Sequence, residues 1–243
     1  MAAILIGAGA AIAAFVASLL PVLVWLAFWI FEEGKHPEPK KVIMTAFVAG
    51  MAAVAVTLPL EYFAANLVPM GFGLVLAWAA TEEIIKFGFA WATVLRWPLT
   101  DRPIDSPVNL ITVALGFSAI ENTLFLFTPI ARGEFFSFLA TGDLRFIGAT
   151  LIHVLSSAII GAALAFAFYR SRKVKIAFGV AGVILAIALH AFFNSLILAT
   201  GEASLLTVFL GVWVGIVFVL LALEGIKGIR RPEWWEKVFV KEQ

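Results

Sequence analysis

The 243-residue sequence is 63% hydrophobic and only 14% charged, with a mean hydropathy of +1.04. Soluble domains carry about 25% charged residues, so these values exclude an ordinary water-soluble fold. The net charge of +1 gives no sign of a nucleic-acid partner, and the lack of cysteine excludes disulfide frameworks and thiolate chemistry.

Apolar blocks of about 20 residues or more divide the chain, and each is long enough to cross a hydrocarbon core about 30 Å thick as a helix. A β-barrel would instead alternate apolar and polar residues over segments of about 10 residues. We therefore predict an all-α, polytopic bundle of about seven spans that forms one transmembrane domain over residues 1–243. The predicted helices lie near residues 3–31, 42–61, 71–95, 107–130, 146–169, 175–199 and 204–224.

Residues 131–145 are predicted to connect the fourth and fifth spans. This stretch contains a short apolar piece at residues 135–138, which is too short to cross a bilayer. We expect it to lie in the membrane interface or to cap the bundle.

The basic residues are distributed unevenly over the predicted connectors. Of the 17 Lys and Arg residues, 14 fall on one side of the seven-span arrangement, whereas Arg132 and Arg145 fall on the other and Lys86 lies within a span. By the positive-inside rule, the N-terminus is predicted to lie outside and the C-terminus in the cytoplasm. Residues 227–243 would form a cytoplasmic tail at the interface, with Trp234 and Trp235 as its anchor.

A small set of ionisable residues falls within predicted spans rather than at their ends. An ionisable group at the centre of a membrane costs roughly 2.5–3.5 kcal/mol on insertion scales. Such residues mark functional sites in membrane proteins, so we take them as candidates. They are Glu82, Glu83 and Lys86 in the third span, Glu121 in the fourth, His153 in the fifth and His190 in the sixth.

The spacing of these residues predicts that they meet. Glu82 and Lys86 are four residues apart on a helix, and so are His153 and Ser157, and His190 and Asn194. Their depths along the predicted spans are similar. We therefore expect one polar cluster that opens toward the extracytoplasmic side.

Such a cluster supports more than one chemistry. A carboxylate beside an apolar wall can activate water, while a histidine with a serine or asparagine stabilises an oxyanion. The same glutamates and histidines could hold a divalent metal such as Zn²⁺. Two other interpretations stay open: ion pairs that only lock the helices together, and an ion- or proton-coupled transporter. A transporter would be favoured by interrupted helices in two similar halves, which the sequence does not show.

Four motifs follow one another on successive predicted spans, after an HPEPK run at residues 36–40. They are EExxK at Glu82–Lys86, FxxxE at Phe117–Glu121, HxxxS at His153–Ser157 and HxxxN at His190–Asn194. In this order, over about residues 20–200, the chain resembles the PrsW family of intramembrane proteases. That family is similar to the type II CAAX prenyl endopeptidases and the bacterial Abi proteins.

The resemblance implies an intramembrane endopeptidase in the cell membrane that cleaves a single-span protein, as in site-1 cleavage of an anti-sigma factor. Glu82 would activate water, with support from Glu83 and Lys86. Glu121 would be a base, a metal ligand or a substrate clamp. His153 and His190 would be metal ligands or oxyanion stabilisers, and Asn194 would complete the catalytic set. The scaffold subunit of γ-secretase resembles a distant, non-proteolytic relative of this superfamily, so a scaffold remains an alternative.

Other classes of intramembrane protease fit the sequence poorly. It contains no HExxH motif, and Asp101, Asp105 and Asp143 all fall in predicted loops, which excludes a presenilin-type aspartate pair. The stretch around Ser118 lacks the final glycine of the rhomboid GxSG motif, so we interpret Ser118 as a packing residue.

Overall fold

The computed structural model describes residues 2–33, 38–199 and 202–233, and these ranges contain helices and no strand. The prediction of an all-α fold is confirmed. His36 and the two tryptophans at 234 and 235 lie outside the described residues. The helices are α1 (Ala2–Glu33), α2 (Lys40–Leu67), α3 (Phe72–Ala90) with the π-helical segment η1 (Trp91–Leu95), α4 (Asp105–Arg132), α5 (Phe135–Leu144), the π-helical segment η2 (Arg145–Ala149), α6 (Thr150–Phe166), α7 (Arg172–Ala199) and α8 (Glu202–Lys227).

Six helical stretches in the described part of the chain are long and apolar enough to cross a bilayer. The helix predicted near residues 71–95 corresponds to α3 and η1. Because α3 carries three charged residues within its 19 residues, it is not among those six. The chain is a multi-pass membrane protein, and a bundle of about seven spans fits it. The outside position of the N-terminus stays a prediction from the basic residues.

The connector predicted at residues 131–145 is wrong for most of its length. Only a turn at Gly133, with φ of 68°, separates α4 from the next helix. From Phe135, helices α5, η2 and α6 form one continuous stretch to Phe166. The apolar piece at 135–138 is therefore the start of a long helix, and Asp143 and Arg145 lie within this helix.

Two of the three aspartates also lie in helices, contrary to the prediction. Asp143 is inside α5, and Asp105 begins α4. Asp105 accepts hydrogen bonds from the backbone N–H groups of Asp101 and Arg102, so it fixes the loop that precedes the helix.

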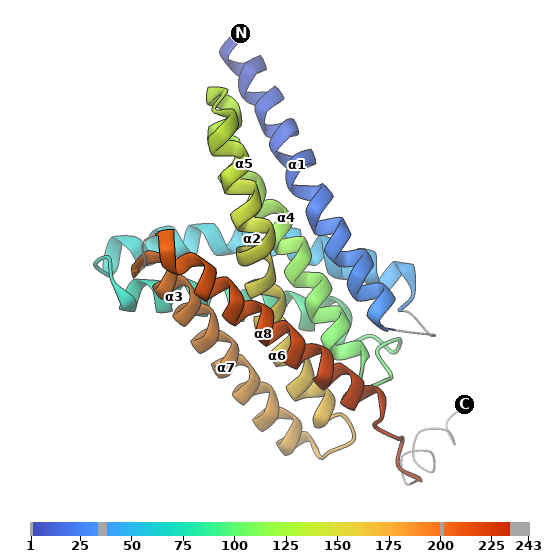
Figure 1. The fold of residues 1–243 in the computed structure, drawn as a ribbon. Coiled ribbons are helices and arrows are strands. Elements are labelled where there is room, and N and C mark those ends of the chain that lie inside the picture. Colours follow the sequence, from blue (N-terminus) through green and yellow to red (C-terminus); the bar gives the residue numbers. More distant parts are fainter. Residues whose placement is uncertain (1, 34–37, 200–201, 234–243) are drawn as a thin grey trace.

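Helix α4 is the centre of the bundle and contacts α1, α2 and α6 (Figure 1). Its contact with α2 needs two glycines. A Cβ atom on Gly50 would collide with the backbone of Val113, and one on Gly116 would collide with the backbone carbonyl of Phe47. Small residues let helices in a membrane approach to backbone contact, and this approach fixes α2 against α4.

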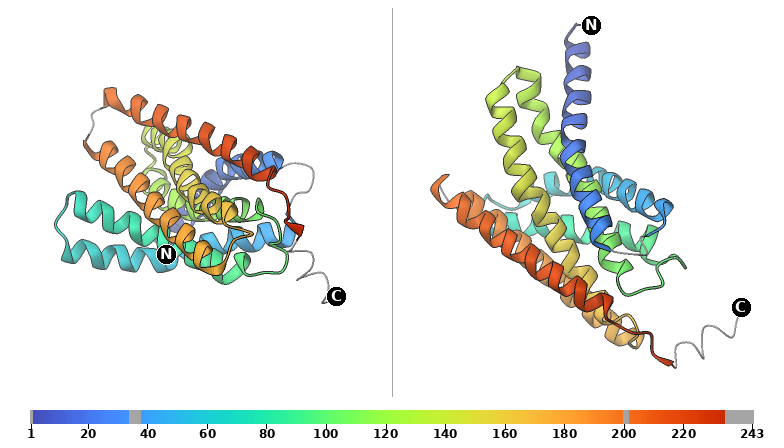
Figure 2. Two further views of the ribbon diagram at one scale, coloured as in Figure 1. Left: turned by 90° about the horizontal axis from the view of Figure 1, so that it is seen from below. Right: turned by 45° about the vertical axis from the view of Figure 1, so that its right-hand side comes forward.

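The helices do not all run in one direction. The α2–α3 hairpin crosses the bundle at a steep angle to α1 and α4, while the ends of α1, α4 and α5 project beyond it (Figures 1 and 2). Helix α3 packs against α2 and α7. The polar residues of α3 thus reach the interior where the hairpin meets α4, α6 and α7.

A group of polar side chains joins the end of α1 to the start of α4. We call it the connector cluster, and its members are Glu33, Glu38, Arg102, Asp105 and Asn109. The Arg102 guanidinium forms ion pairs with Glu33 at 2.9 Å and Asp105 at 2.6 Å. Asn109 donates its side-chain N–H to Glu38 Oε1 at 3.1 Å. Glu38 belongs to the HPEPK run, so its contact anchors the described end of this run to the bundle.

Candidate active site

The EExxK motif places a buried ion pair inside the bundle. Lys86 Nζ donates a hydrogen bond to Glu83 Oε1 at 2.7 Å, and both side chains are fully buried. The Lys86 ammonium also lies 4.9 Å from the centre of the Phe117 ring. Lys86 therefore pairs with the glutamate three residues before it, and Glu82 is left to face other groups.

The two histidines connect to α3 and α4 through carboxylates. His190 Nδ1 lies 2.7 Å from Glu83 Oε1, and His153 Nε2 lies 2.7 Å from Glu121 Oε2. Because an ionised carboxylate only accepts hydrogen bonds, each of these ring nitrogens carries the hydrogen and donates it. The other nitrogen of each ring then carries a lone pair, and on His153 this lone pair accepts a hydrogen bond from Lys86 Nζ at 3.0 Å.

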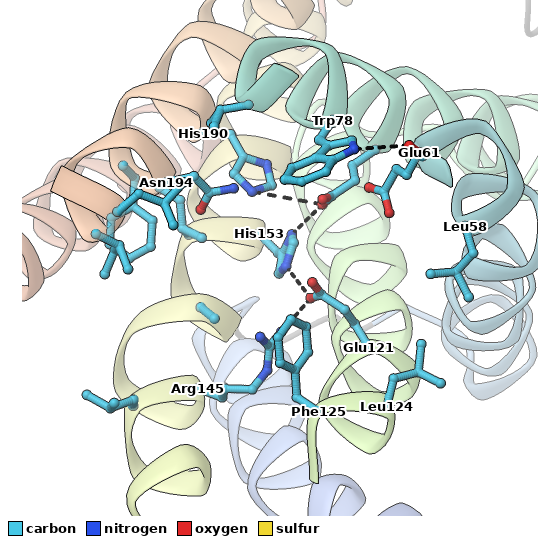
Figure 3. A pocket seen from close by; sticks show the side chains of 18 of the residues that line it. Leu58, Glu61, Trp78, Glu121, Leu124, Phe125, Arg145, His153, His190 and Asn194 are labelled. Atoms are coloured by element: carbon cyan, nitrogen blue, oxygen red, sulfur yellow. Dashed lines mark hydrogen bonds and ion pairs between the residues drawn. The ribbon is translucent and has the colours of Figure 1, made fainter. Parts of the chain in front are cut away.

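Those two lone pairs face the same carboxylate oxygen. Glu82 Oε2 lies 3.5 Å from His153 Nδ1 and 3.9 Å from His190 Nε2 (Figure 3). The two rings are nearly perpendicular, with their centres 4.9 Å apart. Glu82 Oε2 is buried and has no hydrogen-bond partner. Three atoms that carry lone pairs, one each from α3, α6 and α7, therefore converge on one point. The motif spacing predicted that these residues would meet.

Glu121 is held from its other side by Arg145, a residue that the sequence placed on an outer connector. Arg145 Nη2 donates to Glu121 Oε2 at 2.6 Å, and Arg145 Nε donates to Asn122 Oδ1. Sequence analysis did not predict Arg145 as a site residue, because a charged residue near the end of a predicted span is expected to lie at the membrane interface. The available signal is weak: Arg145 is one of only two basic residues on the predicted outer side.

A cavity of about 1020 Å³ leads to the convergent atoms. Its walls are mostly apolar and include Trp78, Phe125 and Phe193. The polar lining residues labelled in Figure 3 lie close to one another in one part of the cavity. The polar lining residues are Glu61, Tyr62, Glu82, Glu121, Arg145, His153, His190 and Asn194. Glu83 and Lys86 are not part of the lining, so they support the site from behind.

Glu61 is a second lining residue that sequence reasoning missed. The predicted second helix ended at residue 61, where a charge was read as interfacial, but α2 continues to Leu67. Glu61 lines the same cavity as Glu82, and its backbone carbonyl accepts a hydrogen bond from Trp78 Nε1 at 3.2 Å. This contact ties α2 to α3 beside the site.

The donor set fits a metal ion. Glu82, Glu83, His153 and His190 each offer a ligand atom, and these atoms lie within 4.8 Å of one another. Two ligand atoms about 2.1 Å from a tetrahedral zinc ion are about 3.4 Å apart, close to the separations from Glu82 Oε2. Both histidines also donate their other N–H to a carboxylate, as metal-binding histidines usually do.

Two features of this cluster were not expected from the sequence. Glu82 rather than Glu121 shares the convergent point with the histidines, and Glu121 instead hydrogen-bonds the far side of the His153 ring. Lys86 Nζ lies 3.0 Å from His153 Nδ1. A cation would therefore compete with the Lys86 ammonium for that lone pair.

Comparison with known proteins agrees with this geometry. The family described as PrsW family intramembrane metalloprotease matches residues 38–223, which include all of the residues that converge here. The protease PrsW of Geobacillus kaustophilus (strain HTA426) is 24% identical over 189 residues, which cover 75% of this chain and 79% of that protein. No solved structure matches the chain. The family match spans well over half of the sequence, and the chain therefore belongs to the PrsW family of intramembrane metalloproteases.

Proposed function

We propose that the protein is an endopeptidase of the cell membrane that hydrolyses a peptide bond of a single-span, membrane-anchored protein, as in site-1 cleavage of an anti-sigma factor. Family membership supports an intramembrane protease. The observation that carries the proposal is the convergence of Glu82 Oε2, His153 Nδ1 and His190 Nε2 at the polar end of an apolar cavity. We take residues 1–243 to be a single protease domain.

Glu82 is the residue best placed to act on water. Its Oε2 atom has no partner and its side chain lines the cavity, so it can take a proton from a water molecule. His153 and His190 direct their lone pairs to the same point. Asn194, one helical turn after His190, would donate to the oxyanion that forms at the substrate carbonyl.

As an alternative to direct proton transfer to Glu82, the residues Glu82, His153 and His190 would hold zinc. When bound there, zinc would polarise a carbonyl and lower the pKa of water. Glu83 and Glu121 would orient the two imidazoles through their N–H groups. Lys86 would neutralise the buried charge of Glu83.

The cavity also indicates the form of the substrate. Its apolar walls suit an apolar segment, yet Glu82 and His190 are only 6% and 1% exposed at its polar end. In a helix, side chains surround the backbone and each carbonyl accepts a hydrogen bond. A scissile bond therefore reaches the polar end only when the substrate helix unwinds locally.

The test uses purified protein in liposomes with single-span substrates. Glu82→Ala, Glu121→Ala, His153→Ala and His190→Ala should each reduce cleavage strongly, whereas Glu134→Ala, which removes a half-exposed carboxylate outside the cavity, should not. Undiminished cleavage in all four variants would contradict the proposal. Ion or proton flux without cleavage would support a transporter, and a stable partner with neither activity would support a scaffold.

A further inference from the structure

The segment η2 brings an arginine to the edge of the active site. Arg145 is the first residue of this π-helical segment, which joins α5 to α6, and its side chain is only 12% exposed. π-Helical turns occur often at functional sites. We propose that Arg145 is a positioning residue that fixes His153 through Glu121, an inference that rests on the proposed function.

Three neighbouring side chains of α4 hold the guanidinium group. Glu121 and Asn122 accept its hydrogen bonds, and the ring of Phe125 lies 3.9 Å from its Cζ atom. Asn122 is itself fixed, because its side-chain N–H donates to Thr150 Oγ1 at 3.0 Å. The planar, forked guanidinium thus has little freedom to move.

The backbone of η2 is held from the opposite side. A Cβ atom on Gly148 would collide with the ring of Phe209 in α8. The segment that carries Arg145 is therefore confined between α4 and α8. Because the backbone of η2 is fixed, the Arg145 side chain starts from a fixed position when it contacts α4.

The same oxygen of Glu121 serves Arg145 and His153. Arg145 Nη2 and His153 Nε2 lie 2.6 Å and 2.7 Å from Glu121 Oε2. The Glu121 side chain is 20% exposed and lines the cavity, so without Arg145 its carboxylate could turn toward water. The N–H group of His153 would then lose a fixed acceptor, and Nδ1 would lose its direction toward Glu82.

Arginine suits this role better than lysine. An ammonium could keep the charge opposite Glu121, but it cannot also form the planar contacts that Arg145 makes with Asn122 and Phe125. Arg145→Lys should therefore have a weaker effect than Arg145→Ala. The matched control is Arg132→Ala, at the end of α4, because Arg132 is 68% exposed and its ion pair with Glu134 is long, at 3.8 Å.

Two measurements on the full-length protein in lipid nanodiscs test the proposal. Steady-state cleavage should show that Arg145→Ala lowers kcat roughly 10- to 100-fold, as expected for loss of a residue that orients an imidazole, with KM unchanged. Proton–nitrogen NMR of protein labelled at its three histidines should show a shifted or lost Nε2–H resonance for His153. The resonance of His190 should stay in place, and Arg132→Ala should change neither measurement.

The resonance of His153 does not require cleavage, so it tests Arg145 even if no substrate is cleaved. If Arg145→Ala does not fold, both measurements are made on Arg145→Lys. This variant should show a smaller fall in kcat and a smaller shift of the His153 Nε2–H resonance. An unchanged His153 resonance with unchanged kcat would overturn the proposal. A rise in KM alone would also overturn it, because it would make Arg145 a substrate-binding residue.

Discussion

Glu82 Oε2 lies 3.5 Å from His153 Nδ1, and the Glu82 oxygen has no hydrogen-bond partner although its side chain is only 8% exposed. A buried carboxylate oxygen without a partner is costly. Its position between two imidazole lone pairs makes a proton of water or a cation the natural partner. This relationship gives the first prediction.

Removal of bound metal should abolish cleavage, and added zinc should restore it, because the three convergent atoms are nitrogen and oxygen donors. Glu82→Gln and His190→Ala should lose most of the zinc affinity, measured by calorimetry in detergent. Glu134→Gln is the control, since Glu134 lies outside the cavity. Full cleavage after exhaustive chelation would show instead that the glutamate acts without metal.

Lys86→Met should destabilise the protein by about 3–5 kcal/mol, the usual cost of removing one partner of a buried ion pair. The reason is that Glu83 would stay charged and buried without Lys86. Unfolding in mixed micelles measures the free energy. The double variant Glu83→Gln/Lys86→Met should recover much of the loss, and a double variant as unstable as the single one would contradict this explanation.

Gly116→Ala should destabilise the contact between α2 and α4, because the added methyl group meets the backbone of Phe47. Overpacking of this kind costs about 1–3 kcal/mol. Gly211→Ala in α8 is the matched control, since a Cβ atom there meets nothing within 4 Å. The melting temperature should fall for the first variant and stay equal or rise for the second. Equal melting temperatures would mean that the two helices separate at little cost.

Glu38 should make stability depend on pH. Burial, with Asp105 and Glu33 nearby, raises the pKa of Glu38 from 4.5 to about 8, although Arg102 opposes the shift. Between pH 4.5 and about 8 the folded protein keeps the Glu38 proton while the unfolded chain releases it. The free energy of unfolding should therefore fall as pH rises through this window.

Glu38→Gln removes this dependence and keeps the oxygen that accepts from Asn109. The variant should become increasingly more stable than the wild type as pH rises from 4.5 to about 8. Unfolding curves across this range provide the measurement, with Glu134→Gln as the control. A constant difference at every pH would show that Glu38 does not titrate in the folded protein.

The sequence allowed most of the bundle to be predicted, because lipid requires long apolar helices and charges within them stand out. It also allowed Glu82, His153 and His190 to be placed together from their motifs. It did not reveal which glutamate pairs with Lys86, since both helical spacings permit a contact. The three-dimensional structure shows that Glu83 forms the ion pair with the Lys86 ammonium. Glu82 instead lines the cavity, and its Oε2 atom has no hydrogen-bond partner.

Arg145 and Glu61 could not be assigned from sequence for a different reason. Hydropathy shows that a charge is near the end of an apolar block, but not whether water or a protein cavity surrounds it. The helix of Arg145 continues without a break, and that of Glu61 runs on to Leu67. Arg145 pairs with Glu121 and Glu61 lines the cavity; both are tertiary relationships, which a pattern along one chain does not contain.

The charge of α3 has a consequence for how the protein is made. This helix is the least able to enter lipid by itself, because Glu82, Glu83 and Lys86 lie within it. It packs against α2 as a hairpin (Figure 1), but its histidine partners come from α6 and α7, which are synthesised later. The buried charges of α3 thus lack their histidine partners until α6 and α7 have been synthesised.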